Sequence, residues 1–166
     1  MTQKTTDMPA DGAESPAMQT RAAPAREGLA AFFAFRSSGA VFALAPAYVD
    51  EVAASVFVHR IPHRAGSAVE GISNFNGEII PVVNAAAAFG INGGGQKSQN
   101  TVLCRVNGER IAFKADSVEG IIRVKNSALK DGGGSPLAAK TIELKAETAR
   151  LIDAELLAEA IARRSI

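Results

Sequence analysis

The sequence predicts a soluble, all-β binding module that ends in a helix. Short apolar runs around glycine-containing turns predict β-hairpins, as at Ser38-Gly39 and Asn76-Gly77. Hydrophobic residues make up 47% of the 166 residues, which is enough for a buried core. The two halves of the chain also resemble each other, which predicts a duplicated barrel unit.

The strands follow in order along the chain. Residues 33–36 and 41–44 form a first hairpin, which Pro46 ends because proline lacks the N–H that a strand ladder needs. Residues 49–58 continue as an extended segment or, given their alanines, as a short helical turn. Two further hairpins are expected at 71–83 and 101–113, with a helical turn at 85–89 between them. Residues 141–144 alternate as a strand, and 153–161 form a helix capped by Asp153.

Residues 1–28 differ in composition from the rest of the chain. They are rich in Ala, Pro and Thr without a hydrophobic period, so we predict a disordered tail. Residues 29–166 form the folded domain, and the glycine-rich stretch near 91–100 is the expected joint between two subdomains. The absence of a signal-like segment or a run of 18 apolar residues predicts a cytoplasmic protein that does not insert into a membrane.

The two halves match when the chain is shifted by 69 positions without gaps. Arg36 then falls on Arg105, Gly39 on Gly108, Ala43 on Ala112 and Val49 on Val118. Unrelated hairpins would also share a glycine turn and alternating apolar residues. The match continues beyond the hairpin, where Asp50 meets Glu119 and Val52 meets Ile121, and this favours a duplication.

The sequence offers no convergent set of catalytic groups, so we predict a protein that is not an enzyme and uses no cofactor or metal. His59 and His63 stand four apart, but Pro62 opposes the helix that would bring them together on a metal ion. Cys104 is the single cysteine, and its place in a predicted strand favours a buried hydrophobe over a nucleophile.

The charged residues predict a solvated surface rather than a charged ligand site. Asp50 and Glu51, and Asp116 with Glu119, are interpreted as surface acids at strand ends and not as a catalytic carboxylate pair. The net charge is +1 without clustered Lys and Arg, so nucleic acid is not an expected partner.

Most of the chain resembles the CheW-like domain of bacterial chemosensory systems. Residues 33–35, 41–44, 49–52 and 60–62 carry the resemblance, and the most specific stretch is 71–84, Gly-Ile-Ser-Asn-Phe-Asn-Gly-Glu-Ile-Ile-Pro-Val-Val-Asn. Residues 111–121 resemble a strand of the family's second half. The resemblance covers about residues 30–166 and implies two SH3-like, five-stranded β-barrels that share a core.

The resemblance also implies an adaptor function. The family couples the cytoplasmic tips of methyl-accepting chemotaxis receptors to the regulatory domain of a CheA-type histidine kinase, without a catalytic step of its own. The protein would then be cytoplasmic and recruited to membrane-associated chemosensory clusters. The implied protein-binding residues are Val49, Glu51, Gly71, Asn74, Asn76, Gly77, Val82 and Asn84.

Two positions depart from the family pattern. Asn76 stands where the family has arginine, and Asn84 where it has aspartate. The family's arginine lies near the acid that matches Glu51, so Glu51 is expected to lack its charge partner here. An exposed ion pair adds only about 0–1 kcal/mol to stability, whereas an interface charge can decide partner choice. We therefore expect the fold to survive and receptor binding to change.

Two other functions stay open at this point. A CheW-like module for another chemosensory assembly, such as pilus motility or polar positioning, is favoured by the Ala- and Pro-rich tail and by Asn76. A small ligand-binding or enzymatic double barrel would need a pocket that combines His59 and His63 with the acids.

Overall fold

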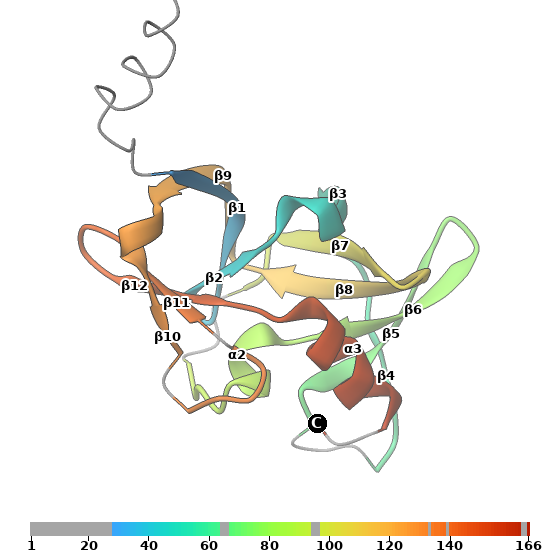
Figure 1. Ribbon diagram of the computed structural model, residues 1–166. Coiled ribbons are helices and arrows are strands. Elements are labelled where there is room, and N and C mark those ends of the chain that lie inside the picture. Colours follow the sequence, from blue (N-terminus) through green and yellow to red (C-terminus); the bar gives the residue numbers. More distant parts are fainter. Residues whose placement is uncertain (1–27, 64–66, 94–96, 133, 139, 164–165) are drawn as a thin grey trace, which may run out of the picture.

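The computed structural model describes residues 28–63, 67–93, 97–132, 134–138, 140–163 and 166. These residues form two six-stranded sheets and a nine-residue helix, α3 (Ala154–Ala162). The strand order is β10-β11-β12-β2-β1-β9 in the first sheet and β3-β7-β8-β6-β5-β4 in the second (Figure 1). The predicted fold class, all-β with a C-terminal helix, is confirmed.

The elements that the sequence predicts lie close to their expected residues, and further strands between residues 117 and 151 were not predicted. The first sheet contains β1 (Leu29–Ser37), β2 (Ala40–Leu44), β9 (Ser117–Lys125), β10 (Leu129–Asp131), β11 (Lys140–Glu143) and β12 (Thr148–Leu151). The second contains β3 (Val49–Ala54), β4 (His59–Arg60), β5 (Val69–Phe75), β6 (Glu78–Val83), β7 (Asn100–Val106) and β8 (Glu109–Ala115). A short helix, α2 (Ala85–Ala88), follows β6, and 3-10 turns lie at Pro46–Tyr48 and Asn126–Ala128.

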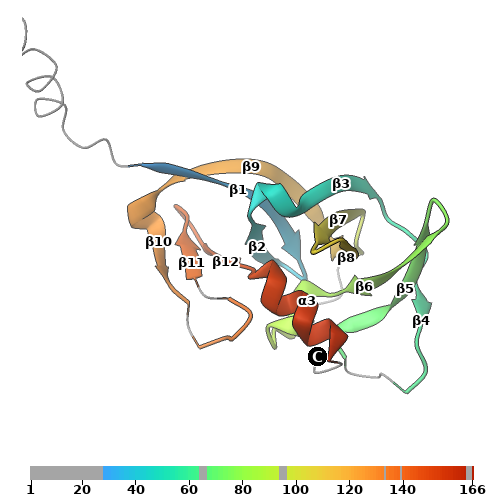
Figure 2. The same cartoon turned by 45° about the vertical axis from the view of Figure 1, so that its right-hand side comes forward.

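Each sheet takes strands from both halves of the chain. The β1–β2 hairpin of the first half lies among β9–β12 of the second half, while β7 and β8 of the second half lie among β3–β6. Figures 1 and 2 show the blue strand β1 running beside the orange strand β9. The expected joint near residues 91–100 lies between α2 and β7, so it separates the repeats in the sequence but not the sheets in space.

The strand pairing repeats with the 69-residue offset that relates the two halves. Phe33 of β1 pairs with Ile121 of β9, and the equivalent Val102 of β7 pairs with Val52 of β3. The parallel β2–β12 and β8–β6 ladders are related by the same 69-residue offset. The register therefore agrees with a duplication in which the two halves have exchanged their first hairpins.

One hydrophobic core joins the two sheets. Phe35 of β1, Phe42 of β2 and Phe113 of β8 are fully buried, and the ring centroid of Phe35 lies 5.9 Å from that of Phe42 and 5.7 Å from that of Phe113. Burying one such side chain stabilises a fold by about 1.5–3 kcal/mol. Because Phe113 belongs to the second sheet and the other two to the first, this cluster is the shared core that the resemblance implies.

The two helices begin at equivalent caps. The Asn84 side chain accepts a hydrogen bond from Ala87 N at 3.1 Å. Asp153, 69 residues later, accepts from Glu155 N at 3.2 Å and from Leu156 N at 3.0 Å, as predicted for this cap.

Two expectations concern other parts of the chain. The predicted tail, except for Gly28, lies outside the described residues. Among the residues that are described, no helix has the length and apolar character needed to cross a membrane.

Candidate interaction surface

The turn between β5 and β6 presents three of the predicted binding residues to solvent. Asn76 and Gly77 have φ angles of 52° and 90°, the left-handed conformation that the Asn-Gly pair predicts. The side chain of Asn74 accepts a hydrogen bond from Gly77 N at 2.9 Å, which holds the turn closed. All three residues are exposed, so the tip of this hairpin is a rigid, polar and uncharged surface.

Glu51 belongs to a charged cluster that strands β3, β6 and β8 bring together. Arg110 Nη2 lies 3.7 Å from Glu51 Oε2 and 3.1 Å from Asp50 Oδ2, and Arg110 Nη1 lies 3.3 Å from Glu78 Oε2. The expectation that Glu51 lacks a charge partner is therefore wrong. The cation comes from β8, which is separated from β3 by β7 in the sheet and from β5 by β6. No local sequence pattern links Arg110 to Glu51, and only the order of the strands brings them together.

Arg110 is the buried centre of this cluster. Its side chain is only 9% exposed, while the side chains of Asp50, Glu51 and Glu78 are 34%, 53% and 46% exposed. Its Nε is buried without a hydrogen-bond partner in the described part of the chain, which costs about 1–3 kcal/mol. The outward face of the cluster is therefore acidic, although a guanidinium lies beneath it.

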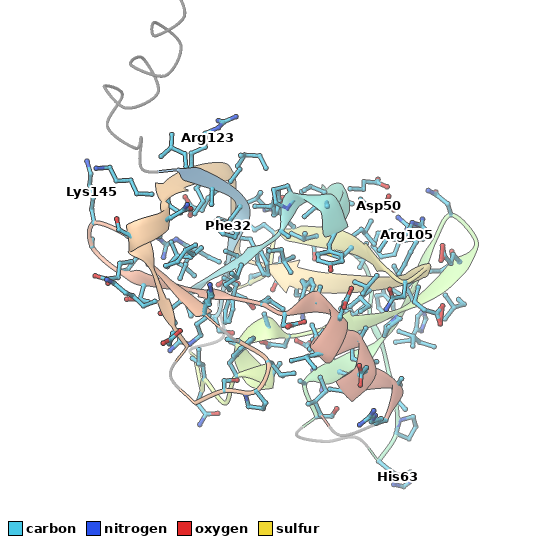
Figure 3. The ribbon with its side chains drawn as sticks, viewed as in Figure 1. Phe32, Asp50, His63, Arg105, Arg123 and Lys145 are labelled. Carbon is cyan, nitrogen blue, oxygen red and sulfur yellow. The ribbon has the colours of Figure 1, made fainter. Side chains whose placement is uncertain are left out.

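Asp50 also connects the two halves of the chain. It is skipped in the β3–β7 register by a β-bulge, which leaves its side chain free to turn toward Arg105 of β7. Arg105 Nη2 lies 3.3 Å from Asp50 Oδ2, and Figure 3 shows the two side chains at the same end of the molecule.

The first sheet contains the equivalent pair. Glu119 is skipped by a bulge in β9, and its Oε1 lies 3.0 Å from Nε of Arg36. Arg36 also donates from both terminal nitrogens to Glu147. The hydrogen bond to Glu147 raises the pKa of Arg36, and the same bond lowers the pKa of Glu147. The sequence repeat already aligned these residues, but it did not predict that they pair.

Four other predicted binding residues support the surface from beneath. Val82 is fully buried and Val49 is half-buried against the main core, so Val82 cannot touch a partner in this conformation. Gly71 lies in β5, where an added Cβ would come within 2.2 Å of the carbonyl oxygen of His59. The side-chain oxygen of Asn84 accepts the hydrogen bond that caps α2. Val82 and Gly71 therefore shape the sheet and Asn84 supports the adjoining helix, while the assignment of these residues to a binding surface stays a prediction.

The side chains considered above as possible catalytic or metal-binding groups make contacts that fit a structural role. Burial raises the pKa of the Cys104 thiol to about 12, with a smaller contribution from the negative charge of Asp50. The exposed ring of His59 contacts Phe57 edge-on, with the centroids 4.8 Å apart. Asp116 accepts a hydrogen bond from Gly39 N at 3.1 Å. Within the described ranges, no group of three His, Cys, Asp or Glu is placed to hold a metal ion.

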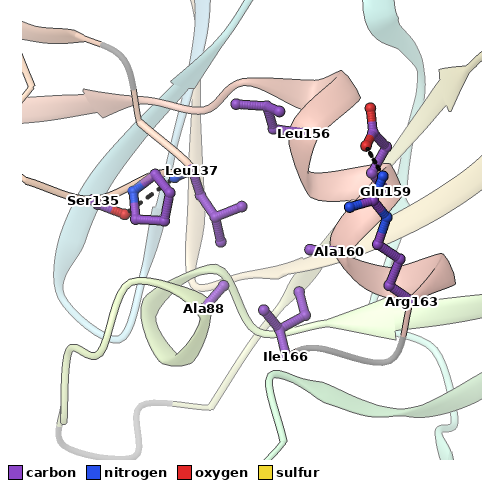
Figure 4. Close-up of a pocket in the computed structure, with 9 residues that line it drawn as sticks. Ala88, Ser135, Leu137, Leu156, Glu159, Ala160, Arg163 and Ile166 are labelled. Atoms are coloured by element: carbon purple, nitrogen blue, oxygen red, sulfur yellow. Dashed lines mark hydrogen bonds and ion pairs between the residues drawn. The ribbon is translucent and has the colours of Figure 1, made fainter.

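A pocket of about 420 Å³ lies between α3, α2 and the loop before β11 (Figure 4). Its walls include Leu137, Leu156 and Ala160, and the ion pair between Arg163 and Glu159, 3.0 Å apart, stands on α3 beside it. This lining suits the packing of an apolar side chain and offers no acid–base pair aimed at a common point.

Comparison with known proteins agrees with this architecture. A family model described as "CheW-like domain" matches residues 31–162. The chain is similar to the chemotaxis protein CheW of Thermotoga maritima, with 38% identity over 61 residues, which are 37% of this chain and only 40% of that protein. The crystal structure of the scaffolding protein TtCheW from Thermoanaerobacter tengcongensis matches with a TM-score of 0.64 and 21% identity, over 74% of this chain and 88% of that one.

Proposed function

The chain belongs to the CheW-like domain family, and from this premise we propose that it is a non-catalytic adaptor that couples chemoreceptors to a CheA-type histidine kinase. Its partners would be the kinase's regulatory domain and the cytoplasmic tip of a methyl-accepting receptor. The adaptor would work in the cytoplasm, in clusters assembled on membrane receptors.

The interleaved construction of the two sheets carries this proposal. An adaptor that transmits receptor conformation to a kinase must hold both partners at a fixed spacing. Here the β1–β2 hairpin cannot leave β9 and β12 without breaking two ladders, and the same is true of β7–β8 against β3 and β6. Relative movement of the two sheets would also open the shared Phe35–Phe113 core. The body is therefore suited to act as a rigid spacer.

We assign the receptor or kinase contact to the exposed residues Glu51, Asn74, Asn76 and Gly77. The acidic cluster around Arg110 borders this face through Glu51 and Glu78. Complementary charge across an interface steers association and selects partners more than it adds affinity. A partner with a cation opposite Glu51 fits this surface best.

Binding of the full chain to both candidate partners tests the proposal. Purified receptor-tip fragment and kinase regulatory domain from the same organism are titrated against the parent protein and Glu51→Gln. We expect Glu51→Gln to weaken one of the two interactions about tenfold, which is about 1.4 kcal/mol. Absence of binding to both partners by the parent protein would refute the adaptor function.

Glu143→Gln is a matched control for this experiment. Its side chain is 56% exposed against 53% for Glu51, and it also has one ion-pair partner, Lys130 at 3.3 Å. Both variants should unfold within a few degrees of the parent because exposed pairs contribute about 0–1 kcal/mol. Equal loss of binding in both variants would show that Glu51 has no specific part in the interface.

The altered turn supports a second candidate, a CheW-like module for another chemosensory assembly. Asn76 presents no charge at the exposed tip, although Arg110 supplies a cation to Glu51 from beneath. Such a module would bind the kinase domain but not ordinary receptor tips. Gain of receptor binding in Asn76→Arg would identify this residue as the cause of the changed partner choice.

A further inference from the structure

A second hollow opens beside the segment that connects β3 to β4, and Glu51 is not among the residues that line it. It has a volume of about 360 Å³, and residues 55–58 form one wall. Glu70 of β5, Lys114 of β8 and Lys97 form others, and Arg60 of β4 completes the lining. The hollow is therefore built by three strands of the second sheet, β4, β5 and β8, and by two connecting segments.

The lining has more positive than negative charge. Lys114 Nζ lies 2.9 Å from Glu70 Oε1, and both side chains are partly buried, so the two charges of this pair neutralise each other. Arg60 and Lys97 are exposed, and neither pairs with a carboxylate among the described residues. Within the described part of the chain, two cations in the lining of the hollow are therefore left without a counter-charge.

Phe57 adds an apolar contact point beside these cations. It is 76% exposed, although a phenylalanine side chain gains about 1.5–3 kcal/mol on burial. Its backbone is fixed, because Phe57 O accepts a hydrogen bond from the buried Ser73 Oγ at 2.8 Å and Ser55 N donates to Gln99 O at 3.0 Å. An exposed aromatic side chain on a fixed backbone is a common anchor of protein interfaces.

The neighbouring backbone favours a polypeptide as the occupant. β4 is the outermost strand of its sheet, and its two residues pair only with β5 among the described strands. A strand at a sheet edge can accept an extended segment by main-chain hydrogen bonds. A small anion would meet the two cations but would leave Phe57 and the strand edge unused.

We infer that this hollow is a docking site for an extended, acidic segment of a protein partner. Carboxylates of the segment face Arg60 and Lys97, and an apolar side chain packs on Phe57. The inference goes beyond the adaptor function proposed above, because none of the residues assigned there to the receptor or kinase contact lines this hollow, and it holds whether or not Glu51 contacts a receptor.

Peptide binding to the full chain tests the inference. The probe is a fluorescein-labelled peptide of about nine residues that alternates Glu and Leu, followed by fluorescence anisotropy. A peptide that alternates Lys and Leu, and inorganic phosphate as a competitor, are measured beside it. We expect the acidic peptide to bind, the basic peptide to bind at least tenfold more weakly, and millimolar phosphate to displace little of the bound peptide.

Substitutions then locate the site. Arg60→Glu combined with Lys97→Glu should weaken binding at least tenfold, and Phe57→Ser at least threefold. Arg123→Glu combined with Lys145→Glu is the matched control, because it changes the net charge equally on the first sheet (Figure 3). All variants exchange exposed side chains, and their melting curves should coincide with that of the parent protein.

Three results would overturn the inference. They are failure of the acidic peptide to bind the parent protein, equal weakening by the control pair, and full displacement by phosphate. The second would show general attraction between charges, and the third a small-anion site. None of the three results bears on binding of the receptor tip or the kinase domain.

Discussion

Gly71→Ala should destabilise the second sheet by breaking the contact between β4 and β5. A Cβ at this position would lie 2.2 Å from the carbonyl oxygen of His59 and 2.8 Å from Cγ1 of Val58. Ordinary van der Waals contact begins near 3.4 Å, so the β4 backbone would have to move by about 1 Å. Both obstacles lie on a segment that is held against β5 by the two-residue strand β4 and by the hydrogen bond from Ser73 Oγ to Phe57 O.

The loss of stability in Gly71→Ala follows from the rigidity of the His59 backbone, which the added Cβ would meet. Overpacking that forces backbone shifts costs about 1–3 kcal/mol. For a domain of this size the melting temperature falls by about 3–5 °C per kcal/mol, so we expect a fall of about 3–15 °C. The measurements are thermal unfolding by circular dichroism and amide hydrogen exchange, which should accelerate first at His59 and Arg60.

His59→Ala serves as the control for Gly71→Ala. It removes an exposed side chain from the same strand pair without adding an atom between the backbones, and should cost no more than about 0.5 kcal/mol. A melting temperature of Gly71→Ala within 1 °C of the parent would refute the reasoning. Any loss of partner binding in Gly71→Ala is then a consequence of the displaced strand, not of a lost contact.

Three further predictions concern titratable groups. The hydrogen bond from Arg36 lowers the pKa of Glu147, so this pair stabilises the fold above the ordinary glutamate pKa of 4.5 and loses its effect as the pH falls below that value. The melting temperatures of Arg36→Ala and the parent should therefore differ at neutral pH and converge in acid. A difference that stays constant with pH would contradict this. Burial raises the pKa of the Cys104 thiol to about 12, so this thiol should resist a thiol reagent in the native protein and react at once in urea. Fast reaction with the reagent in the native protein would show that β7 opens. The hydrogen bond to Glu155 raises the pKa of Tyr48 above 10.0. Because Tyr48 is the only tyrosine of the chain, the absorbance of its phenolate reports this titration directly, and Glu155→Gln should lower the midpoint. An unchanged midpoint would show that the 3.2 Å hydrogen bond does not persist in solution.

The hairpin exchange gives the duplication a mechanical consequence. In a protein with two independent barrels, each half could unfold alone. Here each sheet contains a hairpin of the opposite half, and the Arg36–Glu119 and Arg105–Asp50 pairs cross between halves at both bulges. Unfolding of either half would remove strands from both sheets, so we interpret the domain as one cooperative unit.

Local features of the fold were predictable from the residues alone. The Asn-Gly turn at Asn76 requires positive φ at both positions, and the Asp153 cap requires only a short acceptor before a helix, so each is determined within three or four residues. The alternation of apolar residues likewise predicted the strands, and the place of Cys104 in one of them predicted its burial.

The candidate site was predictable only in part, because its charges come from distant segments. The exposed turn at Asn76 follows from a local pattern, but Arg110 reaches Glu51 from a strand about sixty residues away, and nothing near either residue signals the pair. Val82 was assigned to the binding surface by resemblance, yet its direction in the sheet makes it a core residue.

The sequence by itself determined the all-β class, the turns, the Asp153 cap and the 69-residue repeat, since each depends on neighbouring residues or on a direct comparison of the two halves. Only the tertiary structure decided which half each hairpin joins. A hairpin with one apolar face satisfies the same alternation whether it packs on its own half or on the other, so local pattern does not distinguish the two arrangements. The difference lies in long-range pairing, such as that of Phe33 with Ile121, and this pairing is what turns two similar halves into one interleaved body.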